Sequence, residues 1–130
     1  MFVKSTQVGM STQGWRWAGR RVQQFGDTSL YIFPTADHVT DFGDSRIEPS
    51  IEASEFLKGA IRSGTVRQKG LKRIGNGWLF LRGSNSRAGA QSVDADSVTF
   101  DEYNELDAAN VPQIERRLTG ARQAGRIPRI

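Results

Sequence analysis

The segment Lys4–Thr12, with the sequence KSTQVGMST, constrains the fold of this chain more than any other stretch. It departs in two positions from the phosphate-binding loop pattern G-x-x-x-x-G-K-[ST], in which backbone N–H groups and a helix N-terminus hold phosphate groups. When the pattern is anchored on Gly9, Ser11 takes the Ser/Thr position, and Met10 stands where a lysine is usual. Lys4 occupies the place of the first glycine, so an ammonium group is still present at the start of the loop.

A loop of this kind predicts a binding site for nucleotide phosphates. Lys4 would supply the mobile positive charge, and the Ser11 hydroxyl would be a ligand for Mg²⁺. A polar turn that caps a helix could have the same composition, so the loop alone leaves both interpretations open. The residues that we expect to contact the nucleotide are Lys4, Ser5, Thr6, Gln7, Val8, Gly9, Met10, Ser11 and Thr12.

Charge is unevenly distributed along the chain, although the net charge is only +4. Residues 56–93 contain eight Lys and Arg and no Asp or Glu, whereas residues 94–107 contain six Asp and Glu and no Lys or Arg. An acidic cluster between basic segments is suited to a metal–phosphate site beside a polyanion. A solvated surface with segregated charges is the alternative interpretation.

Several classes of protein are excluded or disfavoured by composition. There is no cysteine and only one histidine, His38, which excludes disulfides and disfavours a zinc site. No apolar run approaches the ~20 residues of a membrane helix, and no signal peptide is recognisable. We therefore expect a protein that is neither secreted nor bound to a membrane.

Hydrophobic spacing in the first half of the chain predicts helices alternating with a strand. Residues 11–22 have helical spacing, and residues 30–33 form an apolar run typical of a buried parallel strand. A second helix is expected from Thr35 to about Arg46. Pro49 would then interrupt the helical pattern, and a third helix is expected over residues 51–61.

The second half begins with a hairpin pattern, in which residues 65–74 and 78–81 flank a Gly-Asn-Gly turn. A strand over 97–100, a helix over 111–121 and a strand from Arg126 complete the series. This order predicts one α/β domain over residues 1–130, similar to P-loop NTPases, with a mostly parallel sheet, flanking helices and a β-hairpin insertion. Because only three residues precede the loop, we expect the domain to be truncated at both ends.

The segment Ser97–Glu102, SVTFDE, predicts the second half of a nucleotide site. A buried strand would deliver Asp101 and Glu102 at its carboxyl end, where open α/β sheets place their ligands. Asp101 would orient Mg²⁺, as the carboxylate of a Walker B strand does, and Glu102 would act as the general base toward water. Acidic residues are also favoured at a helix N-terminus, so the Asp101–Glu102 pair indicates a nucleotide site only in combination with the phosphate loop.

These segments together resemble the N-terminal ATPase domain of bacteriophage terminase large subunits, the motors that package DNA. The resemblance covers nearly the whole chain, and its most specific part is the segment Leu79–Leu106. The phrases that carry it are KSTQVGMST (Lys4–Thr12), LYIFPTADHVTDF (Leu30–Phe42), SRIEPSIEAS (Ser45–Ser54) and LFLRGSNSRAGAQSVDADSVTFDEYNEL (Leu79–Leu106).

The resemblance implies ATP and Mg²⁺ as cofactors. Lys4, Gly9, Ser11 and Thr12 would contact the phosphates and the metal, and Asp101 and Glu102 would take the metal and general-base roles. It also implies double-stranded DNA, a capsid portal and a small terminase subunit as partners of the parent protein. That parent would work as a homo-oligomeric ring in the host cytoplasm. An adenine-contacting segment before the loop, a coupling motif after Arg126 and a nuclease domain are missing from this sequence.

Basic residues outside the loop are candidates for two further roles. Arg82 and Arg87 flank a small-residue loop, and either would stabilise γ-phosphate charge as an arginine finger, within its own site or a neighbour's. Pairing with nearby aspartates is the alternative for each arginine. Lys69, Lys72 and Arg73 on the hairpin are expected to contact duplex phosphates.

Two other functions stay open at this level. One is a helicase-like DNA or RNA translocase, since such motors also combine a phosphate loop with a strand that ends in Asp-Glu. The other is a truncated nucleic-acid-binding remnant without turnover, which the basic segment and the missing ends would favour.

Overall fold

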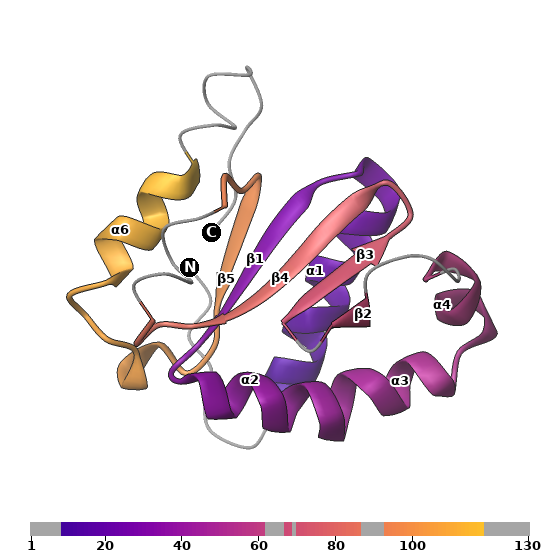
Figure 1. Cartoon of the computed structure of the whole chain (residues 1–130), viewed down its shortest axis with the longest axis horizontal. Coiled ribbons are helices and arrows are strands. Elements are labelled where there is room, and N and C mark those ends of the chain that lie inside the picture. Colours follow the sequence, from indigo (N-terminus) through magenta and orange to yellow (C-terminus); the bar gives the residue numbers. More distant parts are fainter. Residues whose placement is uncertain (1–8, 62–66, 69, 87–92, 119–130) are drawn as a thin grey trace.

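The computed structural model describes residues 9–61, 67–68, 70–86 and 93–118. They form helices on both faces of one sheet (Figure 1). The elements in chain order are α1 (Met10–Phe25), β1 (Thr28–Phe33), α2 (Ala36–Phe42), the π-helical η1 (Gly43–Ile47), α3 (Glu48–Glu52), α4 (Glu55–Ala60), β2 (Arg67–Gln68), β3 (Leu71–Ile74), β4 (Gly77–Gly83), β5 (Ser97–Phe100), the 3₁₀ turn η2 (Tyr103–Glu105), α6 (Val111–Glu115) and the 3₁₀ turn η3 (Arg116–Leu118).

The sheet has five strands in the order β2-β3-β4-β1-β5. Strand β1 lies between β4 and β5 and is parallel to both, while β2, β3 and β4 pair in antiparallel fashion. The sheet is therefore parallel at its centre and at the β5 edge, which is the α/β arrangement that the sequence predicts. The hairpin is not separate from it, because its second strand, β4, belongs to the parallel part.

Strand β1 divides the interior into two hydrophobic clusters because its successive side chains point to opposite faces. Tyr31 and Phe33 pack with α1 and with the helical segment that runs from α2 to α3, in a cluster that includes Trp15. Leu30 and Ile32 pack on the other face with β5, α6 and η3. Burial on both faces explains why this strand is a continuous apolar run in the sequence.

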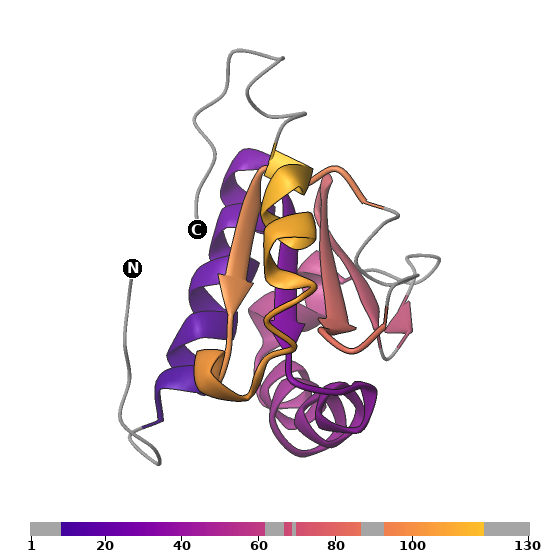
Figure 2. The same cartoon turned by 90° about the vertical axis from the view of Figure 1, so that its left-hand side faces the viewer.

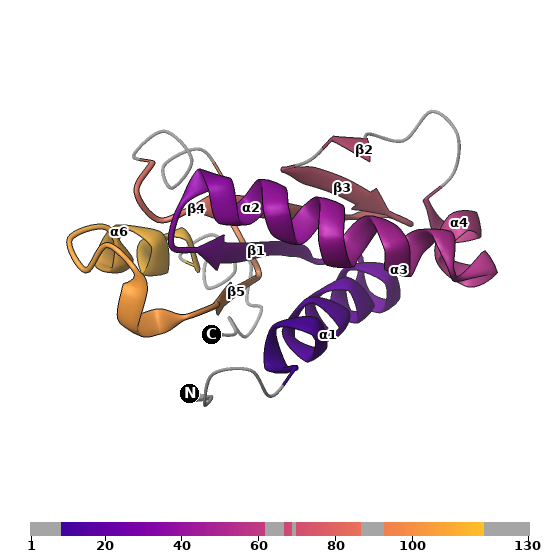
Figure 3. The ribbon, with the colours of Figure 1, turned by 90° about the horizontal axis from the view of Figure 1, so that it is seen from below.

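The expected break at Pro49 does not occur. Elements α2, η1 and α3 form one continuous rod along the sheet (Figure 3), and Pro49 lies in the first turn of α3. Proline lacks an N–H donor and its ring presses on the carbonyl four residues earlier. Here the preceding turn is a wider π turn, closed by the Glu48 N–H on the Gly43 carbonyl, and Ser50 Oγ donates to the Arg46 carbonyl at 2.6 Å. The π turn and this side-chain bond let the helix continue past the proline.

Two other predicted elements are divided in the structure. The helix expected over 51–61 is split at Ser54 between α3 and α4, and the hairpin arm expected over 65–74 is split into the antiparallel strands β2 and β3. Strands β3 and β4 form the expected hairpin, with Ile74 opposite Gly77 across the turn. The predicted helix over 111–121 begins at Val111 but changes to a 3₁₀ turn at Arg116. The strand expected from Arg126 lies outside the described residues. Within the described ranges, no helix is long and apolar enough to cross a lipid bilayer.

Candidate functional site

Three segments meet at the carboxyl ends of β1 and β5. Because the two strands are parallel, the residues that follow them emerge at the same end of the sheet. The first turn of α1 lies at this end too, as Figure 2 shows beside η2 and the start of α2. Gly9 precedes α1 with φ of 72°, in the left-handed region that favours glycine, and the helix runs for 16 residues from Met10. The positive end of the α1 dipole therefore points toward the ends of the strands.

Ser11 and Asp101 form the central contact of this end. Ser11 Oγ donates a hydrogen bond to Asp101 Oδ1 at 3.0 Å. Asp101 is buried, and its backbone N–H donates to the Ile32 carbonyl at 2.8 Å, which extends the β1–β5 ladder by one residue. The carboxylate is thereby fixed at the end of the sheet, with a hydroxyl from α1 beside it. Two oxygen donors of this kind suit a hard cation such as Mg²⁺.

Tyr31 supports this contact from the sheet. Its phenol Oη donates to the Ser11 carbonyl at 3.2 Å, although the ring belongs to the core under α1. Burial, and next the negative charge of Asp101, raise the pKa of Tyr31 well above its usual value. The phenol therefore stays protonated at neutral pH and keeps its donor role toward Ser11.

Glu102 has an unusual backbone. It is the one residue other than glycine among those described with a positive φ, 48°, and it begins the 3₁₀ turn η2. Its N–H donates to Asp101 Oδ1 at 3.1 Å, so this carboxylate oxygen accepts from both Ser11 and the backbone of Glu102. A left-handed conformation at a non-glycine residue costs of order 1 kcal/mol and is commonest where a side chain must be aimed.

A cavity of about 200 Å³ lies between these groups and the start of the α2 rod. At about 30 Å³ per water molecule it has room for a hydrated cation or a phosphoryl group. Seven residues with polar or charged side chains and two phenylalanines line it: Ser11, Phe33, His38, Asp41, Phe42, Ser45, Arg46, Asp101 and Glu102.

His38, Glu102 and Glu105 come close to one another at the rim of this cavity. Their possible metal-ligating atoms all lie within 4.8 Å of one another. His38 Nδ1 is 2.8 Å from the Thr35 hydroxyl, which caps α2 and fixes the orientation of the imidazole ring. His38 and Glu105 are exposed and Glu102 is half-buried, so this group faces solvent.

Comparison with known protein families identifies the family of this chain. A family model described as the phage terminase large subunit gpA, ATPase domain, matches residues 1–122. The chain belongs to this family. No curated protein and no solved structure shows a significant match to it.

Membership of the terminase ATPase family confirms the resemblance and the α/β fold expected from the sequence. It also supports ATPase chemistry as the activity of the family and DNA packaging in phage as its setting. Of the expected nucleotide contacts in this terminase domain, Gly9, Met10, Ser11 and Thr12 lie in the described residues at the start of α1. Lys4, Ser5, Thr6, Gln7 and Val8 lie outside the described residues.

The two arginines predicted as fingers in the terminase domain are Arg82 and Arg87. Arg82 does not line the 200 Å³ cavity: its guanidinium donates to the carbonyls of Gly70 and Leu81 and lies 5.3 Å over the Phe80 ring. Burial lowers the pKa of Arg82. This placement disagrees with an arginine finger within its own site. Arg87 lies outside the described residues.

The hairpin residues expected to bind DNA in the terminase domain fall into different environments. Lys72 is 2% exposed, and its ammonium is 2.8 Å from Glu48 Oε1, so it faces the protein interior and not duplex phosphates. The hairpin register turns Lys72 inward, because alternate residues of β3 point to opposite sides. Arg73 is exposed, with its guanidinium 5.4 Å over the Trp78 ring, and Lys69 lies outside the described residues.

Sequence reasoning misses three residues near the cavity of the terminase domain. Arg46 and His38 line it from the α2 rod, and Tyr31 supports Ser11 from β1. The sequence indicates only a surface helix residue at His38 and the end of a helix at Arg46. The signal available for both is helical spacing, since positions 38, 42, 45 and 46 share one side of a helix that starts at the cavity.

Proposed function

We propose that this terminase ATPase domain binds ATP with Mg²⁺ at the cavity between α1 and the Asp101–Glu102 segment. The observation that carries the proposal is the hydrogen bond from Ser11 Oγ to Asp101 Oδ1, which pairs the end of the phosphate loop with the acidic strand end. The fit of a divalent cation rests on these two oxygen donors, because carboxylate and hydroxyl oxygens are its preferred ligands.

Each group at the site has a separate role in this proposal. The N–H groups of the first turn of α1 bind phosphate oxygens, together with Lys4 and the rest of the loop. Ser11 and Asp101 hold the cation, which when bound neutralises charge on the β- and γ-phosphates. Glu102 accepts a proton from the attacking water as general base. Arg46 lines the same cavity and supplies positive charge for phosphate oxygens, the part first expected of Arg82 or Arg87.

In its parent protein, we propose that this domain drives the translocation of viral double-stranded DNA into a capsid. The proposed partners are DNA, the capsid portal, a small terminase subunit and further copies of the subunit in a ring, in the cytoplasm of the host. Support comes from the family of the chain and from its basic hairpin segment, where Arg73 is exposed. Contact with duplex phosphates would be independent of sequence and sensitive to salt.

The test measures ATP binding and phosphate release separately. Titration calorimetry of the chain with ATP should show binding that requires Mg²⁺ and is lost in Asp101→Asn. The Glu102→Gln variant should keep ATP binding and reduce phosphate release by about 100-fold or more, whether in this chain or in the parent subunit, as expected for loss of a general base. The exposed Glu115→Gln in α6, which does not line the cavity, is the matched control and should release phosphate normally. Unchanged phosphate release in Glu102→Gln would show that Glu102 is not the general base. ATP binding that is unaffected by Mg²⁺ and by Asp101→Asn would show that the proposed site is wrong.

A further inference from the structure

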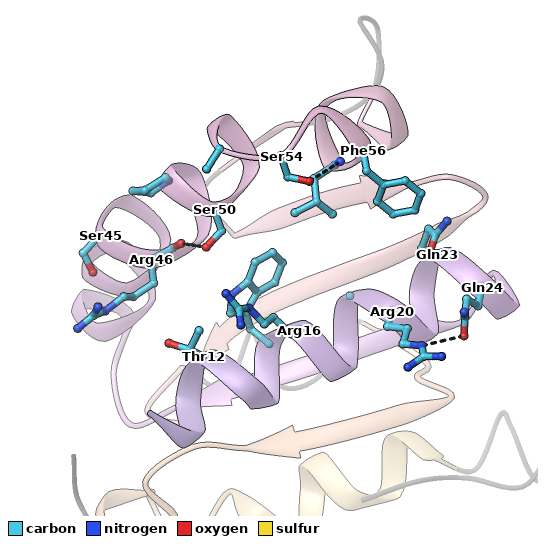
Figure 4. A pocket seen from close by; sticks show the side chains of 15 residues that line it. Thr12, Arg16, Arg20, Gln23, Gln24, Ser45, Arg46, Ser50, Ser54 and Phe56 are labelled. Carbon is cyan, nitrogen blue, oxygen red and sulfur yellow. Dashed lines mark hydrogen bonds between the residues drawn. The ribbon is translucent and has the colours of Figure 1, made fainter. Parts of the chain in front are cut away.

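A second and larger cavity lies along α1 and adjoins the first. It is a groove of about 870 Å³ between α1 and the curved segment formed by η1, α3 and α4 (Figure 4). Along α1 its lining extends from Thr12 to Gln24, which is about 18 Å at 1.5 Å per residue. The groove is therefore long enough for about three turns of another helix.

The groove has an apolar floor. Trp15, which is buried against the sheet, lines it together with Pro49, Leu57 and Phe56. Phe56 is 64% exposed, and α4 contains no buried residue at all. In Figure 4 the Phe56 ring reaches from α4 toward the Gln23–Gln24 end of α1. An exposed aromatic ring beside an apolar floor is typical of a protein-binding groove.

The polar groups of the lining are positively charged or neutral. Arg16 and Arg20 come from α1 and Arg46 from η1, and no Asp or Glu among the described residues lines the groove. Within the same part of the chain, neither Arg16 nor Arg46 forms an ion pair with a carboxylate. Arg20 donates to the neutral Gln24 amide, at 3.2 Å. Three guanidinium groups on the two walls favour a negatively charged occupant.

We propose that this groove is the docking site for an acidic amphipathic helix of a partner protein. Leucine-like side chains of the helix would pack on Trp15, Leu57 and Phe56, and its Glu or Asp residues would pair with Arg16 and Arg46. The apolar floor of the groove disfavours nucleic acid as the occupant, because apolar side chains offer no hydrogen-bonding or charged partner to phosphates. The groove adjoins the proposed nucleotide site, because Ser45 and Arg46 line both cavities. Arg16 and Phe56 line the groove alone.

The test uses two fluorescein-labelled peptides of about 18 residues, long enough to form helix when bound. Both carry Leu on one face; one carries Glu and the other Lys on the opposite face. Fluorescence anisotropy with the whole chain should show binding of the Glu peptide at least about tenfold tighter than that of the Lys peptide. The double variant Arg16→Glu/Arg46→Glu should reverse this preference, whereas Arg73→Glu on the hairpin should leave it unchanged.

Further variants address the floor and the competing ligand. Phe56→Ala should weaken the Glu peptide without changing the thermal melting temperature, because the ring is mostly exposed. No binding of the Glu peptide, equal binding of both peptides, or an unchanged preference in the double variant would overturn the proposal. Displacement of the Glu peptide by a DNA duplex that itself requires Arg16 and Arg46 would overturn it in favour of a nucleic-acid surface. ATP binding measured on Phe56→Ala and on the single variant Arg16→Glu, whose residues line only the groove, distinguishes failure of this site from failure of the nucleotide site.

Discussion

Ser11 and Asp101 are 90 residues apart in the sequence, yet Ser11 Oγ donates to Asp101 Oδ1 at 3.0 Å. The contact exists because α1 packs on β1 with its first turn at the strand's carboxyl end, and because β5 lies parallel beside β1. Tyr31 on β1 joins the two parts, since its phenol donates to the Ser11 carbonyl. The same three elements therefore build both the core and the proposed cation site.

The first prediction concerns the hydrogen bond from Ser11 to Asp101. Ser11→Ala should weaken ATP binding in the presence of Mg²⁺ by at least about tenfold, because one proposed oxygen ligand is lost. Loss of a hydrogen bond to a carboxylate should also lower the free energy of unfolding by about 1–3 kcal/mol. Calorimetry with ATP and urea denaturation measure the two effects. Asp94→Asn, an exposed carboxylate change in the same acidic segment, should alter neither.

Most of the fold could be predicted from the sequence because its signals are local. The apolar run of β1, the helical spacing of α1 and the Gly-Asn-Gly turn each specify one element. The continuous rod from α2 to α3 could not be predicted, because sequence rules place a break at Pro49 and do not show a π turn in front of it.

Half of the candidate site was also accessible to sequence reasoning. Ser11 and Asp101 follow recognisable patterns at a helix start and a strand end, and the parallel sheet brings such positions to one edge. The positions of Arg46 and Lys72 could not be predicted from the sequence. Whether a basic residue faces a cavity or an internal carboxylate depends on helix rotation and strand register, and neither follows from charge alone.

A second prediction concerns the close packing of α1 on Tyr31. A Cβ atom placed on Gly14 would lie 2.7 Å from Tyr31 Oη and 3.3 Å from a ring carbon. Gly14→Ala should therefore destabilise the fold by about 1–3 kcal/mol, although alanine is the better helix former. Gly59→Ala in α4 is the matched control, because no atom lies within 4 Å of its Cβ position. That variant should gain about 0.5–1 kcal/mol. Urea denaturation of both should give opposite signs; equal gains would mean that α1 does not pack this closely.

A third prediction concerns the buried Lys72. Its ammonium pairs with Glu48 between β3 and the helical rod, so Lys72→Ala should lower the free energy of unfolding by about 1–3 kcal/mol. The exposed neighbour Arg73→Ala should cost less than about 0.5 kcal/mol. DNA binding should show the reverse order, with a loss in Arg73→Ala and a weaker salt dependence. Thermal melting and a salt titration of DNA binding separate the two roles, and equal behaviour of both variants would contradict the observed burial.

The last prediction is a pH dependence that arises from Tyr31. Burial, and then the charge of Asp101, raise the pKa of Tyr31 in the folded chain above the value of about 10 in unfolded chains. Its stabilising effect is therefore complete below pH 10 and is lost as the pH rises above 10, because the unfolded chain releases the phenolic proton first. Over the interval from pH 9 to pH 11, the free energy of unfolding should fall by about 1.4 kcal/mol more in the original chain than in Tyr31→Phe, because the unfolded phenol is half ionised at about pH 10. Urea denaturation between pH 9 and pH 11 measures this decrease. Tyr103→Phe is the control, since Tyr103 is 54% exposed, and it should keep the larger decrease; parallel curves for Tyr31→Phe and the original chain would contradict the burial of the phenol beside Asp101.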